Sequence, residues 1–260
     1  LKAQVGPDLK ITSPPKADRV GQQSHFWFDG RQAPWTAESD WAKARELLPE
    51  RSMTVSAWVS VDKTRTYGGI VSAIQDNGDA EAGWVLGYDK TSFYFGLASV
   101  GADDGNGMMT YLVGKSEIEL GKWYHVCASY DGATMQLWVD GTLDGESTVQ
   151  HGDILYPKQA DLAVGGYLDN NESTPHAGRL RQVTIYDLAA KPAWVKHDFE
   201  HHSEWTSLKP VLDPSLPFGF LVKPYLQYAT HDSIRVVCEL TKPGKAIVRF
   251  GETSNYTHQA

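Results

Sequence analysis

Apolar and polar positions along the chain point first to a β-hairpin within residues 121–141. Strand patterns occupy 123–130 and 135–139, and Asp131 and Gly132 lie between them. Glycine adopts a positive φ without a Cβ clash, and an aspartate at a turn accepts hydrogen bonds from nearby backbone N–H groups. Neither face of the predicted hairpin is cleanly polar, so we expect it to lie inside a larger β-structure.

Similar short strand patterns recur at regular intervals on both sides of this hairpin. They are rich in β-branched or aromatic residues and are separated by loops containing Gly, Asp and Asn, which is typical of a β-sandwich. The expected strands are 25–28, 54–61, 69–74, 84–88, 93–100, 108–113 and 181–186. Two helices are also expected. One lies within 37–48 with Ser39 or Asp40 as its N-cap, and the other runs from Pro192 to about Ser203.

The order of these pieces resembles the LamG-like jelly roll (laminin-G, concanavalin-A-type) over roughly residues 24–200. The resemblance implies an all-β fold, a two-sheet antiparallel jelly-roll sandwich with a short helix, but no particular chemistry. The pieces that carry it are Phe28-Asp29-Gly30, Met53 to Val59, Trp123, His125-Val126, Tyr130-Asp131-Gly132, Trp138-Val139-Asp140-Gly141 and Gly178 to Tyr186. Residues expected to be buried between the sheets are Trp58, Val126, Ala128 and Val139.

The chain divides into four predicted segments. Residues 1–23 are polar and read as an extended lead-in, and 24–205 hold the jelly roll with its terminal helix. A proline-rich linker follows over 206–223. Residues 224–260 begin a new strand pattern and are expected to form the first strands of a second, truncated domain.

This last segment resembles the start of the fibronectin-III-like domain that precedes the catalytic domain in purple-acid-phosphatase-type metallophosphoesterases. Its matching pieces are Lys223 to Gln227, Ser233 to Val237 and Val248 to Gly251, while Cys238 stands where relatives usually have Trp. Such a domain has about seven strands, and only about three fit before residue 260. We therefore expect a catalytic domain to follow, because the D-x-H and G-N-H-[DE] metal motifs are absent here.

Composition narrows the range of partners and compartments. The 260-residue chain carries a formal net charge of −8 and has no basic stripe, which argues against nucleic acid or an anionic membrane as partner. No apolar run approaches the ~20 residues of a membrane-spanning helix. We expect a secreted or periplasmic protein, and since no signal peptide is visible at Leu1, the sequence would then represent its mature form. Cys127 and Cys238 are expected to be buried free thiols.

Acidic loops suggest a cation site at one end of the sandwich. If the strands form a meander, the loops at 75–83 and 101–107 lie at the same end. Their oxygen-rich side chains suit a hard cation such as Ca²⁺, and LamG-like relatives often carry calcium. The alternative is that Asp and Asn are simply what turns require. The predicted structural calcium ligands are Asp76, Asp79, Asp103 and Asp104.

The abundance of aromatic residues favours a non-catalytic binding or targeting module. Exposed rings on a concave sheet would stack on sugar faces, so a carbohydrate or cell-surface ligand is expected beside the chain's own downstream catalytic domain. Core packing is the competing interpretation for each ring, and a structural or protein-interaction spacer without a small ligand is the alternative function. The candidate ligand-binding residues are Trp84, Tyr88, Tyr94, Tyr111 and Trp138.

No catalytic residue is predicted in this chain. A glucanase would need paired carboxylates in one cleft, and Glu38-Ser39-Asp40 lacks a following Glu and a strand around it. His197 to His201 matches the H-x-x-E-H metalloprotease pattern, but the expected reading is a solvated helix face. We therefore expect the chain not to be an enzyme; a glycosidase is the least favoured alternative.

Overall fold

The computed structural model describes residues 17–20, 23–36, 40–78, 80–207, 220–227, 235–240, 249–250 and 258–259. Side chains are described within 25–36, 40–78 and 80–200. Contacts divide the chain into a unit of residues 1–19 and 23–207 and a second unit of residues 20–22 and 208–260. The first unit contains the sandwich and both candidate pockets discussed below.

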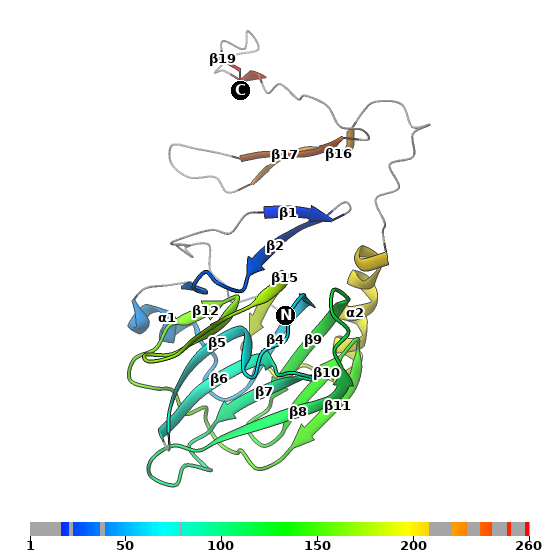
Figure 1. Ribbon diagram of the computed structural model, residues 1–260. Helices are drawn as coiled ribbons and strands as arrows, with labels where there is room; N and C mark the ends of the chain where they lie inside the picture. The colour runs from blue at the N-terminus through cyan, green and yellow to red at the C-terminus, as the bar shows by residue number, and fades with distance from the viewer. Residues whose placement is uncertain are drawn as a thin grey trace. The chain divides into compact units, whose positions relative to one another are not determined.

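Two antiparallel sheets form this unit (Figure 1). In spatial order, the first sheet comprises β1 (Ala17–Val20), β2 (Gln23–Asp29), β15 (Ala177–Tyr186), β4 (Met53–Val61), β9 (Trp123–Tyr130), β10 (Met135–Val139) and β11 (Thr142–Ser147). The second comprises β3 (Trp35–Thr36), β12 (Leu162–Val164), β5 (Gly68–Asn77), β6 (Ala80–Tyr88), β7 (Ser92–Ala98) and β8 (Met109–Glu117). The predicted all-β two-sheet sandwich is confirmed.

The predicted hairpin is β9 and β10, which pair antiparallel. Val139 lies opposite Val126, and Met135 lies opposite Tyr130. The Oδ1 atom of Asp131 accepts hydrogen bonds from the backbone N–H groups of Ala133 and Thr134 at 3.0 and 2.8 Å. β9 also pairs with β4, so the hairpin occupies the interior of the first sheet.

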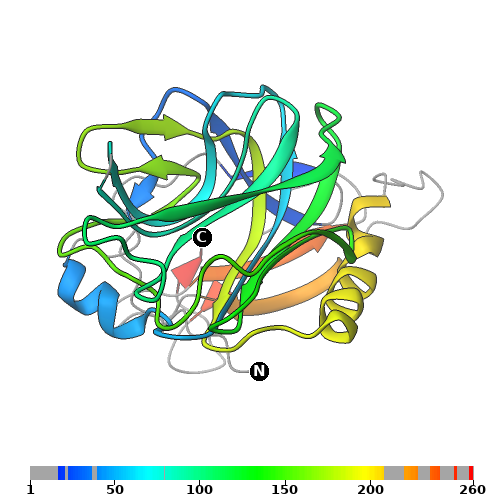
Figure 2. The ribbon, with the colours of Figure 1, turned by 90° about the horizontal axis from the view of Figure 1, so that it is seen from below.

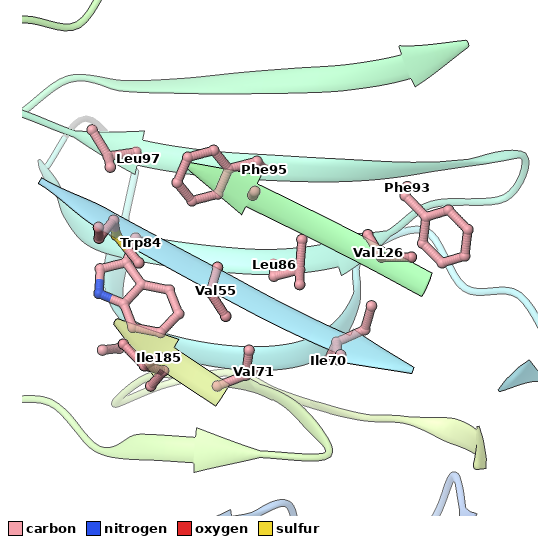
Figure 3. Close-up of a cluster of buried hydrophobic side chains, with 14 of the residues drawn as sticks. Val55, Ile70, Val71, Trp84, Leu86, Phe93, Phe95, Leu97, Val126 and Ile185 are labelled. Atoms are coloured by element: carbon pink, nitrogen blue, oxygen red, sulfur yellow. The ribbon is translucent and has the colours of Figure 1, made fainter. Parts of the chain in front are cut away.

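Alternate residues of each strand form one hydrophobic core between the sheets (Figure 3). β4 and β9 contribute side chains from one sheet, and β6 and β7 contribute side chains from the other. Val126, Ala128 and Val139 lie in this core, as predicted. Burial of a Val, Leu, Ile or Phe side chain contributes roughly 1.5–3 kcal/mol, so this layer supplies most of the driving force for folding.

Trp58 does not lie between the two sheets, contrary to the prediction. The residue is buried, but it lies on the outer face of the first sheet, because its neighbours Ala57 and Val59 point into the core. Its ring stacks on Phe199, with the ring centroids 5.9 Å apart. Side chains alternate along a strand, and both faces of β4 are covered, so the apolar character of Trp58 did not reveal its direction.

Two helices lie at opposite sides of the sandwich (Figures 1 and 2). α1 (Trp41–Leu47) begins after Asp40, whose carboxylate accepts hydrogen bonds from the N–H groups of Ala42 and Lys43, as a preferred N-cap does. α2 (Pro192–Ser207) begins at the predicted proline and runs a turn beyond the predicted end. Val195 of α2 packs against Cys127 and Trp138 on the outer face of the first sheet.

Three two-stranded sheets complete the described structure. β13 (Gly166–Leu168) pairs with β14 (Ser173–Pro175) beside β5, whereas the other two pairs belong to the second unit. These are β16 (Phe220–Gln227) with β17 (Arg235–Leu240), and β18 (Arg249–Phe250) with β19 (His258–Gln259). β16 begins inside the stretch predicted to be a linker. Cys127 is a buried free thiol as expected, and the Cys238 side chain lies outside the described residues.

Candidate functional site

Three of the five candidate aromatic residues lie inside the molecule. Trp84 and Tyr88 point into the core between the sheets, where Figure 3 shows the indole of Trp84 among aliphatic side chains. The indole N–H of Trp84 donates to the hydroxyl of Tyr156 at 3.0 Å. Trp138 is 1% exposed and packs beneath α2. These rings offer no accessible face, so they are structural residues in this fold.

Tyr94 and Tyr111 lie together on the outer face of the second sheet. Tyr94 of β7 alternates with Phe93 and Phe95, which face the core, and therefore points outward. The ring centroids of Tyr94 and Tyr111 are 5.8 Å apart in an edge-to-face arrangement. This geometry stabilises aromatic pairs beyond their area of burial.

These two tyrosines line a pocket of about 270 Å³, which we call the tyrosine pocket. Its lining residues are Thr66, Tyr67, Asp89, Lys90, Tyr94, Tyr111 and Val113. Tyr67 is 60% exposed and Val113 is 49% exposed, so the pocket presents apolar surface to solvent. Small apolar pockets with a few fixed polar groups are typical of ligand sites.

Glycines on neighbouring strands make room for both tyrosines. Tyr94 pairs with Gly87 of β6, and Tyr111 pairs with Gly96 of β7. A Cβ atom at Gly96 would stand 3.0 Å from the Tyr111 ring. The two glycines therefore leave the outer face free for large rings beside the pocket.

The two tyrosine hydroxyls differ in their hydrogen bonding. The hydroxyl of Tyr111 donates to Oδ2 of Asp76 at 2.7 Å, and its pKa is raised by burial and then by that carboxylate. The Tyr94 side chain is 3% exposed, and its hydroxyl has no hydrogen-bond partner among the described residues. Burial also raises the pKa of Tyr94, which stays a neutral donor. A buried hydroxyl without a partner is unfavourable unless a ligand or water satisfies it.

Asp89 and Lys90 form the turn at the edge of the pocket. Oδ1 of Asp89 accepts hydrogen bonds from the N–H groups of Thr91 and Ser92 at 2.7 and 2.8 Å, which fixes this turn. Asp89 is the only carboxylate among the pocket's lining residues. A glycosidase of the usual kind needs two carboxyl groups flanking the bond that breaks.

The predicted calcium loops do lie at one end of the sandwich, since Gly107 packs against the backbone of Glu81. The described aspartates serve local structure there. Asp103 accepts hydrogen bonds from the N–H groups of Gly105 and Gly107, and Asp76 accepts one from Tyr111. Asp104 accepts one from the N–H of Asn106, and Asp79 lies outside the described residues. Among described residues, no group of three His, Cys, Asp or Glu side chains could hold a metal.

The residues of the H-x-x-E-H match in α2, at positions 197–201, have different surroundings. His197 and Glu200 are exposed, and Glu200 lies 3.7 Å from Lys196 in an i, i+4 pair. Asp198, between them, approaches Nε2 of His125 at 3.0 Å. The His201 side chain is not described, so the motif's second histidine lies outside the part of the chain that can be compared.

Five residues that line the tyrosine pocket were not among the sequence candidates. Thr66 and Tyr67 precede β5, Asp89 and Lys90 follow β6, and Val113 lies in β8. The one available signal was Tyr67, a large aromatic side chain among polar loop residues. An aromatic residue in a polar turn is a candidate contact even without a motif.

A family model described as the concanavalin A-like lectin/glucanases superfamily (Laminin_G_3) matches residues 36–196. The chain belongs to this superfamily. Human pappalysin-1 is 24% identical over 175 residues, which cover 64% of this chain and 11% of pappalysin-1. The chain therefore spans about a tenth of the length of this curated relative.

Solved structures share the superfamily fold at low identity. The binding domain of Paraclostridial Mosquitocidal Protein 1 is 12% identical, with a TM-score of 0.53 over 75% of this chain and 47% of that one. The receptor binding domain of the botulinum neurotoxin C/D mosaic serotype is 12% identical, with a TM-score of 0.55 over 89% and 57%. Within the residues that the structure describes, no helix is long and apolar enough to cross a membrane.

Proposed function

We propose that the sandwich is a non-catalytic carbohydrate-binding module, and that a sugar of a glycan or cell-surface ligand occupies the tyrosine pocket. The observation that carries this proposal is the buried hydroxyl of Tyr94, which lacks a partner among described residues and belongs to a residue that lines the pocket. A sugar hydroxyl would accept its hydrogen bond. The exposed ring of Tyr67 supplies a face on which the C–H surface of a pyranose can stack.

Two further observations support binding over catalysis. The pocket has one carboxylate, whose Oδ1 is engaged by its own turn, so the acid and nucleophile of a retaining glycosidase are lacking there. Both solved structures named above are described as binding domains, and the superfamily's name includes lectins. A secreted or periplasmic location fits a module that meets glycans outside the cell.

The proposal is tested with a glycan array followed by calorimetry on the 260-residue chain. Tyr94→Phe removes only the unpartnered oxygen, so it should weaken glycan binding about tenfold while leaving folding stability equal or higher. Tyr67→Ala should weaken binding by a similar factor through loss of stacking. Trp27→Ala is the matched control, because this partly exposed aromatic lies on the other sheet.

Two results would reject the carbohydrate module. One is an array without any bound glycan, which would favour a structural spacer. The other is glycan binding that neither Tyr94→Phe nor Tyr67→Ala weakens, which would place the sugar elsewhere on the molecule.

We also propose that the module targets a hydrolase, specifically a metallophosphoesterase domain encoded downstream in the parent protein. The support is the resemblance of residues 223–251 to a fibronectin-III-like domain, within which β16 and β17 pair antiparallel. The parent reading frame should then encode D-x-H and G-N-H-[DE] motifs after residue 260, and the longer protein should hydrolyse phosphate esters. A downstream sequence without these motifs would reject this part of the proposal.

A further inference from the structure

A second pocket lies on the outer face of the first sheet, beside α2, and we call it the His125 pocket. Its volume is about 270 Å³. β4, β9 and β15 contribute side chains to it, and α2 contributes Asp198. The lining residues are Ser56, Trp58, His125, Gln182, Thr184, Tyr186 and Asp198. It belongs to the opposite sheet from the tyrosine pocket and shares no residue with it.

His125 lines this pocket and has a buried ring nitrogen without a partner among the described residues. Its side chain is 1% exposed, and Nε2 lies 3.0 Å from Oδ2 of Asp198. The carboxylate can only accept, so in the neutral ring the proton resides on Nε2 and Nδ1 carries a lone pair. Nδ1 is buried and has no hydrogen-bond partner among the described residues.

Trp58 adds a buried donor next to this acceptor. Trp58 pairs directly with His125 across β4 and β9, and the two ring centroids are 5.3 Å apart. The indole is 2% exposed, and its N–H likewise lacks a partner within the described chain. The pocket thus combines one unpartnered donor with one unpartnered acceptor, although most buried polar groups in proteins are paired.

The rim of the pocket carries backbone strain. Gln182 has a φ of +50°, in the left-handed region that favours glycine. It lies where the register of β15 against β4 shifts between Arg181 and Thr184. Bulges and strained residues of this kind concentrate beside functional sites, where they redirect side chains. The exposed Gln182 side chain stands at the mouth of the pocket.

We propose that the His125 pocket binds a small neutral hydroxylated molecule, of the class of monosaccharides and polyols. A hydroxyl group both accepts and donates, so it can satisfy Trp58 Nε1–H and His125 Nδ1 together. An anion would face the Asp198 carboxylate and the Nδ1 lone pair. A cation would gain nothing from the indole N–H. This site would give the module a second point of attachment, independent of the tyrosine pocket.

Nuclear magnetic resonance of the whole chain tests the proposal. The indole ¹⁵N–¹H cross-peak of Trp58 is assigned by its loss in Trp58→Phe. The probes are D-glucose, D-galactose, L-arabinose and glycerol at millimolar concentrations. At least one should shift this cross-peak and the Thr184 methyl resonance along the same saturable curve, because both groups line the pocket.

Trp58→Phe keeps a ring but removes the donor, so the affinity read from the Thr184 methyl should fall about tenfold. Trp123→Phe is the matched control, since Trp123 lies on the same face of β9 outside the pocket, and it should leave the affinity unchanged. Tyr94→Phe should also leave it unchanged, which separates this site from the tyrosine pocket. The proposal is overturned if none of the four probes shifts the Trp58 cross-peak, or if Trp58→Phe binds with the affinity of the wild type. A sugar-soaked crystal that shows only water in the pocket would overturn it as well.

Discussion

Tyr94 occupies the space above Gly87, its partner across β6 and β7. A Cβ atom at Gly87 would stand 2.6 Å from Cζ of Tyr94 and 2.7 Å from its hydroxyl oxygen. Real Cβ atoms essentially never approach other heavy atoms so closely. The absence of a side chain at Gly87 therefore allows the ring and hydroxyl of Tyr94 to lie where they do beside the tyrosine pocket.

Gly87→Ala should disrupt this arrangement. The added methyl would also stand 2.4 Å from the carbonyl oxygen of Gly68, which belongs to the sheet backbone and cannot move cheaply. We expect a loss of about 1–3 kcal/mol in the free energy of unfolding, measured with urea, together with loss of glycan binding. Gly145→Ala is the control, because its new methyl comes within 3.4 Å of the flexible Leu112 side chain alone and meets the Val113 carbonyl oxygen at an ordinary contact distance of 3.5 Å. Equal losses in the two variants would contradict the steric explanation.

The sandwich itself was predictable because its strands are short, regular and bounded by turn residues. The β9–β10 hairpin follows from the alternation on either side of Asp131 and Gly132. The short strands β12 to β14 escaped prediction, since three residues do not show a period. Local patterns therefore specified the fold class, while tertiary pairing decided the short edge elements.

The five candidate ring residues show why the sequence did not reveal which rings are exposed. Alternation places Trp84 and Tyr88 on one face of β6 and Val85 on the other, but both faces are apolar. The outer face is apolar because Tyr167 of the β13–β14 hairpin covers part of it. The sequence therefore did not determine which face of β6 points into the core. Trp138 was misassigned for the same reason, since α2 covers its face.

Gln182→Gly should stabilise the fold. At a φ of +50° a residue with a Cβ atom is strained by roughly 1–2 kcal/mol, whereas glycine is not. The greater freedom of glycine in the unfolded chain offsets about 0.5–1 kcal/mol, which leaves a net gain of up to about 1.5 kcal/mol. Thermal and urea unfolding measure it. Gln32→Gly, at an exposed position without a positive φ, should be destabilising, and a loss of similar size in both variants would argue against strain.

The calcium site remains a prediction, which replacing two aspartates with the uncharged asparagine can test. Asp103→Asn with Asp104→Asn keeps an oxygen that can accept the loop's backbone hydrogen bonds. Weak binding at these loops should raise the melting temperature of the wild-type chain at millimolar calcium, and a chelator should reverse the rise. The double variant should show no rise while matching the wild type in chelator. If calcium leaves the melting temperature of the wild-type chain unchanged, the predicted site is contradicted.

His176 should make stability fall in mild acid. The side chain is fully buried, and burial lowers its pKa from 6.5 to about 3. The hydroxyl of Tyr88 lies 3.1 Å from Nδ1 of His176 and also accepts the N–H of Ala177 at 3.2 Å, an arrangement that suits a neutral ring. The folded chain therefore keeps His176 unprotonated at pH values where the unfolded chain binds a proton.

The sign of the effect follows from this difference. Above pH 6.5 neither state is protonated at His176, and the full stability is present. As the pH falls from 6.5 toward 3, proton uptake by the unfolded chain lowers the free energy of unfolding by about 1.4 kcal/mol per pH unit. His176→Gln lacks this contribution, although loss of packing should make it less stable near neutral pH. The stability difference between wild type and variant, from urea unfolding, should therefore shrink by about 2 kcal/mol between about pH 7 and about pH 5. Parallel stability curves for the two proteins over that range would show that His176 does not stay neutral in the fold.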